Sequence, residues 1–298
     1  MRFRLYLKEL KLTNKCNKEN ISYVLNEFEK LIVGSDQVWN PLCSDGDTTF
    51  LLNIDNVHFE KYSYAASIGN PENIEQFSGD YRKALADFKL ITVREDSAAF
   101  FLREQIHREC KVVLDPVFLP DPLFWEQITG NLKTHEPYIF VYNLMNLDDL
   151  LTLVISLANR TSLKVIVISR TVIYDYKFFR KCSKHFPIKI MSNCGPKQFL
   201  QLLTGADFIV TDSFHGSALS IIFKKIFFTI PNLEKNNTNS RIHTLLSGVG
   251  LEDRLVTSSM EDDLFLKPID YLAVEKKLQP LRKKSIDVLQ QIITFDIP

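Results

Sequence analysis

Residues 206–220 read ADFIVTDSFHGSALS, an apolar run that ends at two polar residues and is followed by a histidine, His215. The β-branched and aromatic run Phe208–Thr211 predicts a buried strand, and the apolar stretch beyond the turn predicts a helix packed against it. Asp212 and Ser213 are residue types that begin helices. The stretch therefore predicts a strand, a turn and a helix of an α/β sheet.

The turn in this stretch is a candidate anion site. Ligands of open α/β sheets bind at the carboxyl ends of strands, where the unpaired N–H groups of the next helix favour anions. Asp212, Ser213, His215 and Gly216 would lie at such a place. The alternative is that Asp212 and Ser213 only cap the helix while His215 fills a polar turn. The spacing alone leaves both interpretations open.

The composition is that of an ordinary globular protein, at a length where one core tends to divide into two. The chain has 298 residues, 45% of them hydrophobic, and Lys plus Arg equals Asp plus Glu at 36 each. This balance offers no global field for nucleic acid or a membrane surface, so an anion site must be local. Five cysteines without a CxxC pair argue against a disulfide framework or a structural zinc, and no apolar stretch is long enough for a membrane span. We expect a cytoplasmic protein without a metal.

Strands and helices alternate in two blocks, which predicts parallel sheets with crossover helices. A proline-punctuated connection separates the blocks, so we expect one domain over 1–130 and a second over 131–298. The second should end in amphipathic surface helices between Tyr271 and Ile293. The expected strands are 30–33, 62–66, 90–93, 112–114, 138–142, 164–168, 188–191, 208–211 and 225–230.

The segment GSDQVWN at 34–40 is a candidate sugar-binding turn, because it follows an expected strand and carries Asp36, Gln37 and Trp39. An exposed tryptophan stacks on the apolar face of a sugar ring, while polar neighbours bond its hydroxyls. The alternative is a strand-to-helix turn with a core tryptophan.

Two arginines are candidates for binding phosphate or carboxylate, since a planar guanidinium holds two oxygens at once. Arg94 follows an expected strand, and Arg241 follows a polar loop. The alternatives are a surface pair of Arg94 with Glu95 or Asp96, and a solvent-exposed Arg241.

Six strings extend these signals along the chain. They are GSDQVWNP at 34–41, SYAASIG at 63–69, ITVRE at 91–95, VVLDPVFL at 112–119, TDSFHGSALSIIFKKIFF at 211–228, and NSRI with LLSGVGLEDRL between 239 and 255. In this order they resemble the polysaccharide pyruvyl transferase family from about residue 30 to 256. The resemblance implies an α/β fold of two Rossmann-like domains similar to the glycosyltransferase-B architecture, with the acceptor side first and the donor side second.

The reaction that the resemblance implies moves the pyruvyl group of phosphoenolpyruvate onto two hydroxyls of a sugar, leaving a ketal and free phosphate. Phosphoenolpyruvate would be a co-substrate, and no other cofactor is expected. The acceptor would be a cell-surface or capsular glycan or a lipid-linked sugar, and the latter would bring the protein to the inner membrane. The oligomeric state, including a homo-oligomer, stays open.

The resemblance also distributes roles. His215, in the family's SFHG motif, and Arg94 would be catalytic. Donor-binding residues would be Asp212, Ser213, Gly216 and Arg241, and acceptor-binding residues Asp36, Gln37 and Trp39.

The chain departs from the family at its start, since members begin with a further strand and a glycine-containing turn upstream of GSDQVWN. Only 33 residues precede Gly34, so we expect a shortened member whose first domain lacks its first strand and exposes a sheet edge. Two alternatives remain. One is a non-catalytic relative that binds glycan or a partner chain through that edge, and the other is a nucleotide-sugar glycosyltransferase.

Overall fold

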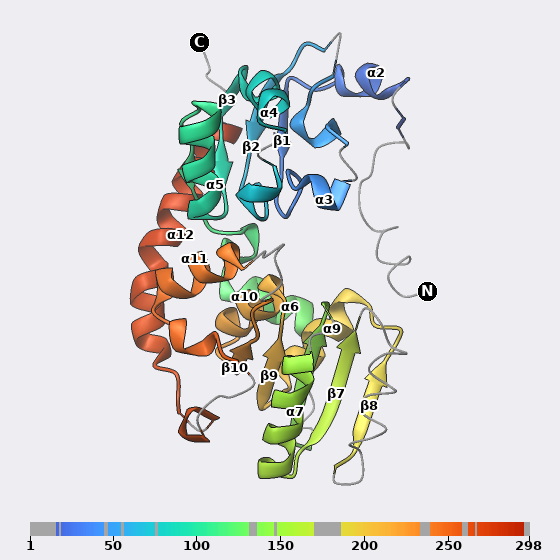
Figure 1. Cartoon of the computed structure of the whole chain (residues 1–298), viewed down its shortest axis with the longest axis vertical. Coiled ribbons are helices and arrows are strands. Elements are labelled where there is room, and N and C mark those ends of the chain that lie inside the picture. Colours follow the sequence, from blue (N-terminus) through green and yellow to red (C-terminus); the bar gives the residue numbers. More distant parts are fainter. Residues whose placement is uncertain are drawn as a thin grey trace. The chain divides into compact units, whose positions relative to one another are not determined.

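The computed structural model forms two compact units, each assembled from segments far apart in the sequence (Figure 1). Unit 1 comprises residues 1–11, 120–233 and 250–275, and unit 2 comprises residues 12–119, 234–249 and 276–298. The structure describes residues 16–17, 19–44, 47–54, 57–74, 77–130, 136–145, 148–169, 186–232, 239–257, 262–265 and 267–294.

Unit 1 is built on a five-stranded parallel sheet of order β10-β9-β6-β7-β8. Its strands are β6 (Tyr138–Asn143), β7 (Lys164–Ser169), β8 (Ile188–Met191), β9 (Phe208–Thr211) and β10 (Ile226–Thr229). Its helices are α6 (Pro122–Thr129), α7 (Asp148–Thr161), α9 (Pro196–Thr204) and α10 (Phe214–Ile222), with short turns η6 (Glu252–Arg254) and η7 (Asp262–Phe265). The inner strands form nearly continuous apolar runs because helices cover both faces of a parallel sheet.

Unit 2 contains a three-stranded parallel sheet of order β1-β2-β3 and a two-stranded parallel pair, β4-β5. The strands are β1 (Lys30–Val33), β2 (Glu60–Ser63), β3 (Phe88–Leu90), β4 (Thr92–Val93) and β5 (Lys111–Val112). Single bridges link Ala66 to Asp36 and to Val93, which join the ends of β1, β2 and β4. Among the described strands, β1 therefore lies at an edge of its sheet.

The helices of unit 2 are mostly short. They are α2 (Ile21–Leu25), α3 (Pro41–Ser44), η1 (Thr49–Leu51), η2 (Pro71–Asn73), α4 (Ser78–Leu85), α5 (Asp96–Phe101), η4 (Leu102–Ile106), η5 (Pro116–Phe118) and α11 (Ser240–Val249). Most of the long helix α12 (Tyr271–Ile293) also belongs to this unit. The amphipathic segment expected at the C-terminus is thus one helix, which continues through Pro280.

The units differ from the single division expected between residues 130 and 131. Helix α11 and the part of α12 after residue 275 belong with the N-terminal strands, and α6 belongs with the C-terminal ones. Apolar packing explains the assignment of α12, because Val288 and Ile292 lie in one core cluster with Tyr62 and Val113. Helix α6 is tied to α9, where Gln201 donates to the carbonyl of Thr129 at 3.0 Å.

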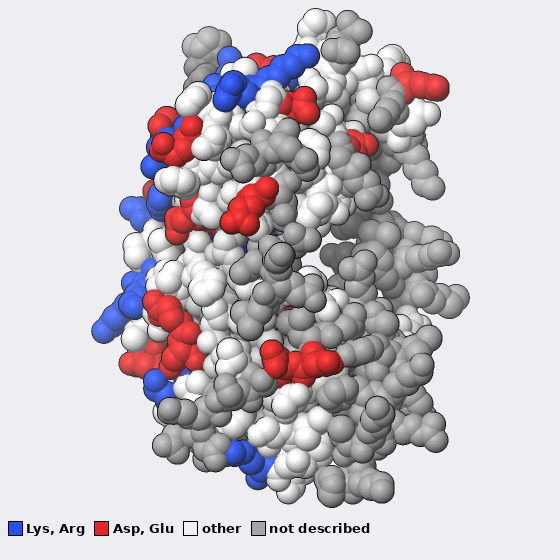
Figure 2. All heavy atoms as spheres, in the orientation of Figure 1, with Lys and Arg blue, Asp and Glu red and all other residues white. Residues whose placement is uncertain are grey.

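Each expected strand has a counterpart in the structure, and the expected strand 90–93 is divided into β3 and β4. On the face shown in Figure 2, basic and acidic side chains both occur, in keeping with the balanced formal charge. Among the described helices, none combines the length and apolar character needed to cross a membrane.

Candidate functional site

The order of the strands reverses in the middle of the unit 1 sheet. From β6 the chain moves outward to β7 and β8, then returns to β9 on the other side of β6 and continues to β10. Open α/β sheets bind ligands where the order reverses, outside the carboxyl ends of the strands. The loops after β6 and β9 hold that position. The second loop carries Asp212 and Ser213 and leads into α10, whose first turn carries His215.

Asp212 joins these two loops. Its carboxylate accepts hydrogen bonds from the backbone N–H of Leu144 at 2.8 and 3.1 Å and from that of Met145 at 2.7 Å. Asp212 is buried, and bonds from N–H groups to a charged carboxylate are about twice as strong as neutral ones. Asp212 therefore shapes the loop after β6, rather than capping α10 as the sequence suggested.

The N-terminal turn of α10 presents His215. Ser213 is the N-cap, and its hydroxyl accepts from the N–H of Gly216 at 3.4 Å. His215 is the second residue of the helix, half-buried, with its ring 5.4 Å from that of Phe214 in an edge-on contact. The imidazole thus lies beside the N–H groups that make a helix start favourable for anions.

Gly216 lets α10 start directly against β9. A Cβ atom at this position would lie 2.4 Å from Oγ1 of Thr211, which is shorter than a van der Waals contact. The Thr211 hydroxyl has no room to move, because it donates to the carbonyl of Tyr142 at 2.8 Å and accepts from the N–H of Ser213 at 3.0 Å. The glycine is therefore explained by close approach of helix and strand.

Unit 2 contains a second group of the predicted residues, centred on Arg94. The Nη1 atom of Arg94 lies 2.6 Å from Oδ2 of Asp115, and Nη2 lies 3.0 Å from Oδ1 of Asp36. The hydroxyl of Ser35 also donates to Oδ2 of Asp115, at 2.8 Å. Arg94 and Asp115 are buried, whereas the side chain of Asp36 is 59% exposed. These ion pairs join Arg94 to residues that follow β1 and β5, and the burial of Arg94 rules out a surface pair with Glu95 or Asp96.

Arg241 also belongs to this group, since its Nη1 atom lies 3.6 Å from Oδ1 of Asp36. Helix α11, which carries it, is held to unit 2 by the Ser240 hydroxyl, which donates to the carbonyl of Gly69 at 3.2 Å. Burial, and then the like charge of Arg94, lower the pKa of Arg241 to about 10. The alternative of a solvent-exposed Arg241 is wrong. The structure pairs this predicted donor-binding residue with the predicted acceptor-binding residue Asp36.

Two carboxylates of the group were not predicted as site residues, namely Glu95 and Asp115. Glu95 is fully buried, and its Oε1 atom accepts from the hydroxyl of Ser67 at 2.9 Å and the N–H of Ile68 at 3.0 Å. Burial raises the pKa of Glu95, while the charges of Arg94 and Arg241 act in the opposite direction. The available signal was position, because both acids follow expected strands in the strings ITVRE and VVLDPVFL.

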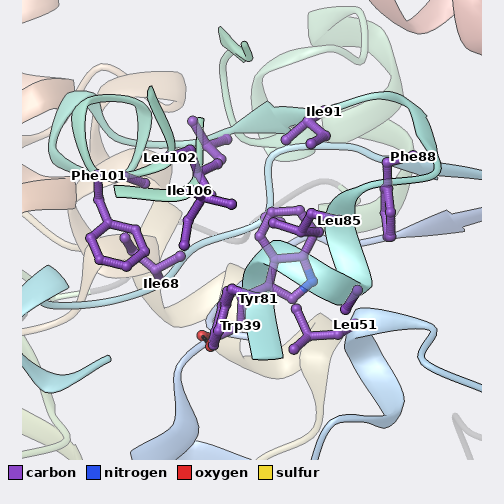
Figure 3. Close-up of a cluster of buried hydrophobic side chains, with 14 of the residues drawn as sticks. Trp39, Leu51, Ile68, Tyr81, Leu85, Phe88, Ile91, Phe101, Leu102 and Ile106 are labelled. Carbon is purple, nitrogen blue, oxygen red and sulfur yellow. Dashed lines mark hydrogen bonds between the residues drawn. The ribbon is translucent and has the colours of Figure 1, made fainter. Parts of the chain in front are cut away.

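The expected sugar-stacking role of Trp39 is contradicted by its burial. Trp39 is 1% exposed, its indole donates to the carbonyl of Phe50 at 2.8 Å, and its ring packs edge-on against Phe88 (Figure 3). The hydroxyl of Tyr81 donates to its backbone carbonyl. The core interpretation is the correct one, because the turn directs the indole inward between α4 and η1.

Gln37 lies in the same turn and organises it. Its Oε1 atom accepts from Nδ2 of Asn40 at 2.7 Å, and this pair packs against Gly69, where a Cβ atom would lie 2.5 Å from the Asn40 amide. Gly69 has a φ of +73°, which favours glycine. Within the described part of the chain, no three His, Cys, Asp or Glu side chains are grouped as a metal site would need.

Solved structures place the fold in a known class. A UDP-GlcNAc 2-epimerase from Methanocaldococcus jannaschii, in complex with UDP-GlcNAc and UDP, has a TM-score of 0.56 at 16% identity and covers 97% of this chain and 88% of its own. MnaA of S. aureus, with UDP, has a TM-score of 0.55 at 13% identity, covering 97% and 84%. The protein therefore has an α/β fold of the glycosyltransferase-B type.

The family follows from the sequence itself. Residues 3–234 match the model of the polysaccharide pyruvyl transferase family, and the chain belongs to that family. No curated protein sequence matches it significantly.

Proposed function

We propose that this protein is a pyruvyltransferase, which moves the pyruvyl group of phosphoenolpyruvate onto sugar hydroxyls of a cell-surface or capsular glycan as a ketal. One observation carries the proposal. The chain belongs to the family, and its SFHG motif lies where the strand order of the unit 1 sheet reverses, with His215 in the first turn of the capped helix α10. Such a turn offers both N–H groups for an anion and an imidazole, which can donate or accept a proton.

The reaction needs one proton donor and one departing anion. The methylene carbon of phosphoenolpyruvate takes up a proton, the first sugar oxygen bonds to the neighbouring carbon, and the bond from that carbon to the phosphate oxygen breaks. The second sugar oxygen then closes the ketal, so that one hydroxyl proton replaces the proton delivered to the methylene and the other leaves with phosphate. We assign His215 to moving these protons or to assisting the departing phosphate.

The residues of unit 2 fit supporting roles in this proposal. Asp36 is the exposed carboxylate of the group, and two guanidiniums hold it in place, so it is the proposed contact for acceptor hydroxyls. Gln37 would act beside it. Because Arg94 is buried and ion-paired on two sides, we propose that it orients Asp36 rather than touching the reacting atoms. We also propose a cytoplasmic protein that a lipid-linked acceptor brings to the inner membrane.

The test follows phosphate release from phosphoenolpyruvate with a panel of p-nitrophenyl glycosides as acceptors, and product mass identifies the ketal. His215→Ala should lower kcat by about 100-fold or more, the usual range for loss of a general acid or base, without a change in Tm. His58→Ala, at an exposed histidine, is the matched control and should retain full activity.

The alternatives give different results in the same preparation. Thermal stabilisation by UDP-GlcNAc but not by phosphoenolpyruvate would replace the proposal with a nucleotide-sugar transferase. Two of the structural neighbours were solved with UDP, one of them also with UDP-GlcNAc. Failure to bind phosphoenolpyruvate, together with concentration-dependent self-association, would support a non-catalytic binding protein.

A further inference from the structure

Glu95 is a buried acid that the proposed chemistry does not use. It follows β4 and is 0% exposed, although an ionised carboxylate is costly to remove from water. A buried charge is tolerated when opposite charges and hydrogen bonds compensate it. The groups around Glu95 should therefore show which part of the structure it positions.

One oxygen of Glu95 organises a turn that leads to α11. Its Oε1 atom accepts from the Ser67 hydroxyl and from the N–H of Ile68, and the Ser67 hydroxyl in turn accepts from the N–H of Gly69 at 3.2 Å. The carbonyl of Gly69 then accepts from the hydroxyl of Ser240, the first residue of α11. A continuous series of hydrogen bonds therefore joins Glu95 to the start of the helix that carries Arg241.

The carboxylate of Glu95 also interacts electrostatically with two arginines. Oε2 is buried, and no hydrogen-bond partner for it occurs among the residues that the structure describes. The guanidiniums of Arg94 and Arg241 both stabilise the ionised carboxylate electrostatically. Arg94 has direct ion pairs with Asp115 and Asp36, and Arg241 has one with the exposed Asp36, at 3.6 Å. The charge of Glu95 raises the pKa of Arg241 more than that of Asp36 does, so Glu95 is a buried counter-charge for Arg241.

We propose that Glu95 is a positioning residue, which holds the guanidinium of Arg241 and the first turn of α11 beside the ends of β1 and β4, in readiness for an anionic substrate. This inference rests on the proposed function for the identity of that anion. It does not require Glu95 to touch the substrate, since the carboxylate acts through Arg241.

Glu95→Gln tests the role of the charge, because the amide keeps an acceptor oxygen for Ser67 and Ile68. We expect the KM for phosphoenolpyruvate to rise about tenfold while kcat changes less than about twofold, the pattern of lost binding rather than lost chemistry. Glu104→Gln is the same change at an exposed position of unit 2 and should alter neither constant. Three results would overturn the proposal. They are a fall in kcat as large as the rise in KM in Glu95→Gln, a rise in KM of the same size in Glu104→Gln, and no effect of Glu95→Gln on KM.

The pH profile separates positioning from a general structural role. The charged groups that act on Glu95 are Arg94 and Arg241, and burial raises its pKa above the ordinary value of 4.5. Acidification toward that pKa removes the charge in the wild type, so the ratio of the KM of Glu95→Gln to that of the wild type should fall toward one. The ionisation of phosphoenolpyruvate cancels in this ratio.

A spectroscopic measurement keeps the inference independent of activity. The Nε–H signal of Arg241, assigned by its loss in Arg241→Lys, should exchange with solvent faster in Glu95→Gln and at the wild-type rate in Glu104→Gln. Unchanged exchange in Glu95→Gln overturns the positioning role. If exchange accelerates but the wild type releases no phosphate, the proposed reaction fails while Glu95 is still shown to hold Arg241.

Discussion

Nη1 of Arg94 lies 2.6 Å from Oδ2 of Asp115, and each of the two side chains is 1% exposed. The pair links the end of β4 to the end of β5, since Arg94 follows the first strand and Asp115 comes shortly after the second. Removing one partner of such a pair leaves the other charge buried without its nearest opposite charge.

Asp115→Asn should therefore destabilise the protein strongly. We expect the free energy of unfolding to fall by about 3 kcal/mol, near the lower end for a broken buried pair because Asp36 still compensates Arg94. Asp87→Asn breaks the more exposed pair of Asp87 with Lys61, at 2.9 Å, and should cost less than about 1 kcal/mol. Urea denaturation of both variants measures the difference, and equal losses would contradict the importance of burial.

The stability of the protein should also depend on Glu95 in a defined pH window. Its pKa is raised in the folded state, so between the ordinary value and the raised value the folded protein binds more protons than the unfolded chain. Stability from this group is then fully present at low pH and is lost as pH rises through the folded pKa. Denaturation midpoints of Glu95→Gln, relative to the wild type, should increase as the pH rises from the ordinary pKa of 4.5 through the raised pKa of Glu95. Parallel curves for the two proteins would contradict the raised pKa.

Gly216→Ala should disturb the start of α10. The added methyl group meets Thr211, so we expect a loss of about 1–3 kcal/mol, the usual range for overpacking, and a fall in phosphate release as His215 shifts. Gly248→Ala, in α11, is the control. Its Cβ atom would lie 3.6 Å from Leu281 in ordinary contact, and the change should stabilise the helix by about 0.5–1 kcal/mol. A destabilised Gly248→Ala or an unaffected Gly216→Ala would show that close approach is not the reason for Gly216.

Asp212→Ala should release the loop after β6. The backbone N–H groups of Leu144 and Met145 lose their carboxylate acceptor, and a hydrogen bond to a charged group contributes about 1.5–3 kcal/mol. Hydrogen exchange of these two amides should accelerate. Asp207→Ala removes an acceptor from the N–H of Tyr138, at the opposite end of the same strand, and should leave the two amides protected. Equal acceleration in both variants would point to general unfolding instead.

The strands could be predicted because their signal is local. Buried parallel strands need continuous apolar runs, as in Phe208–Thr211, and polar turn residues end them. The same locality explains why the candidates at strand ends were found. His215, Asp212 and Ser213 follow β9 directly, so their common turn could be deduced without any knowledge of distant contacts.

The partners within the site could not be predicted, because strand pairing decides them. Asp115 is 21 residues from Arg94 in sequence and Asp36 is 58 residues away, so neither stands out from a local pattern. Glu95 resembled a surface partner of Arg94, yet it is fully buried. The inward direction of Trp39 depends on the packing of α4 and η1, which the sequence of its own turn does not contain.

Helix α11 has a consequence for any attempt to divide the protein. Residues 240–249 come late in the chain, but they supply Arg241 to Asp36 and Ser240 to Gly69 within unit 2. A fragment that stops at residue 130 would lack this helix, together with Val288 and Ile292 of α12 that complete its core. A gene for unit 2 alone would have to be rearranged, with the codons for residues 234–249 and 276–298 joined to those for residues 12–119.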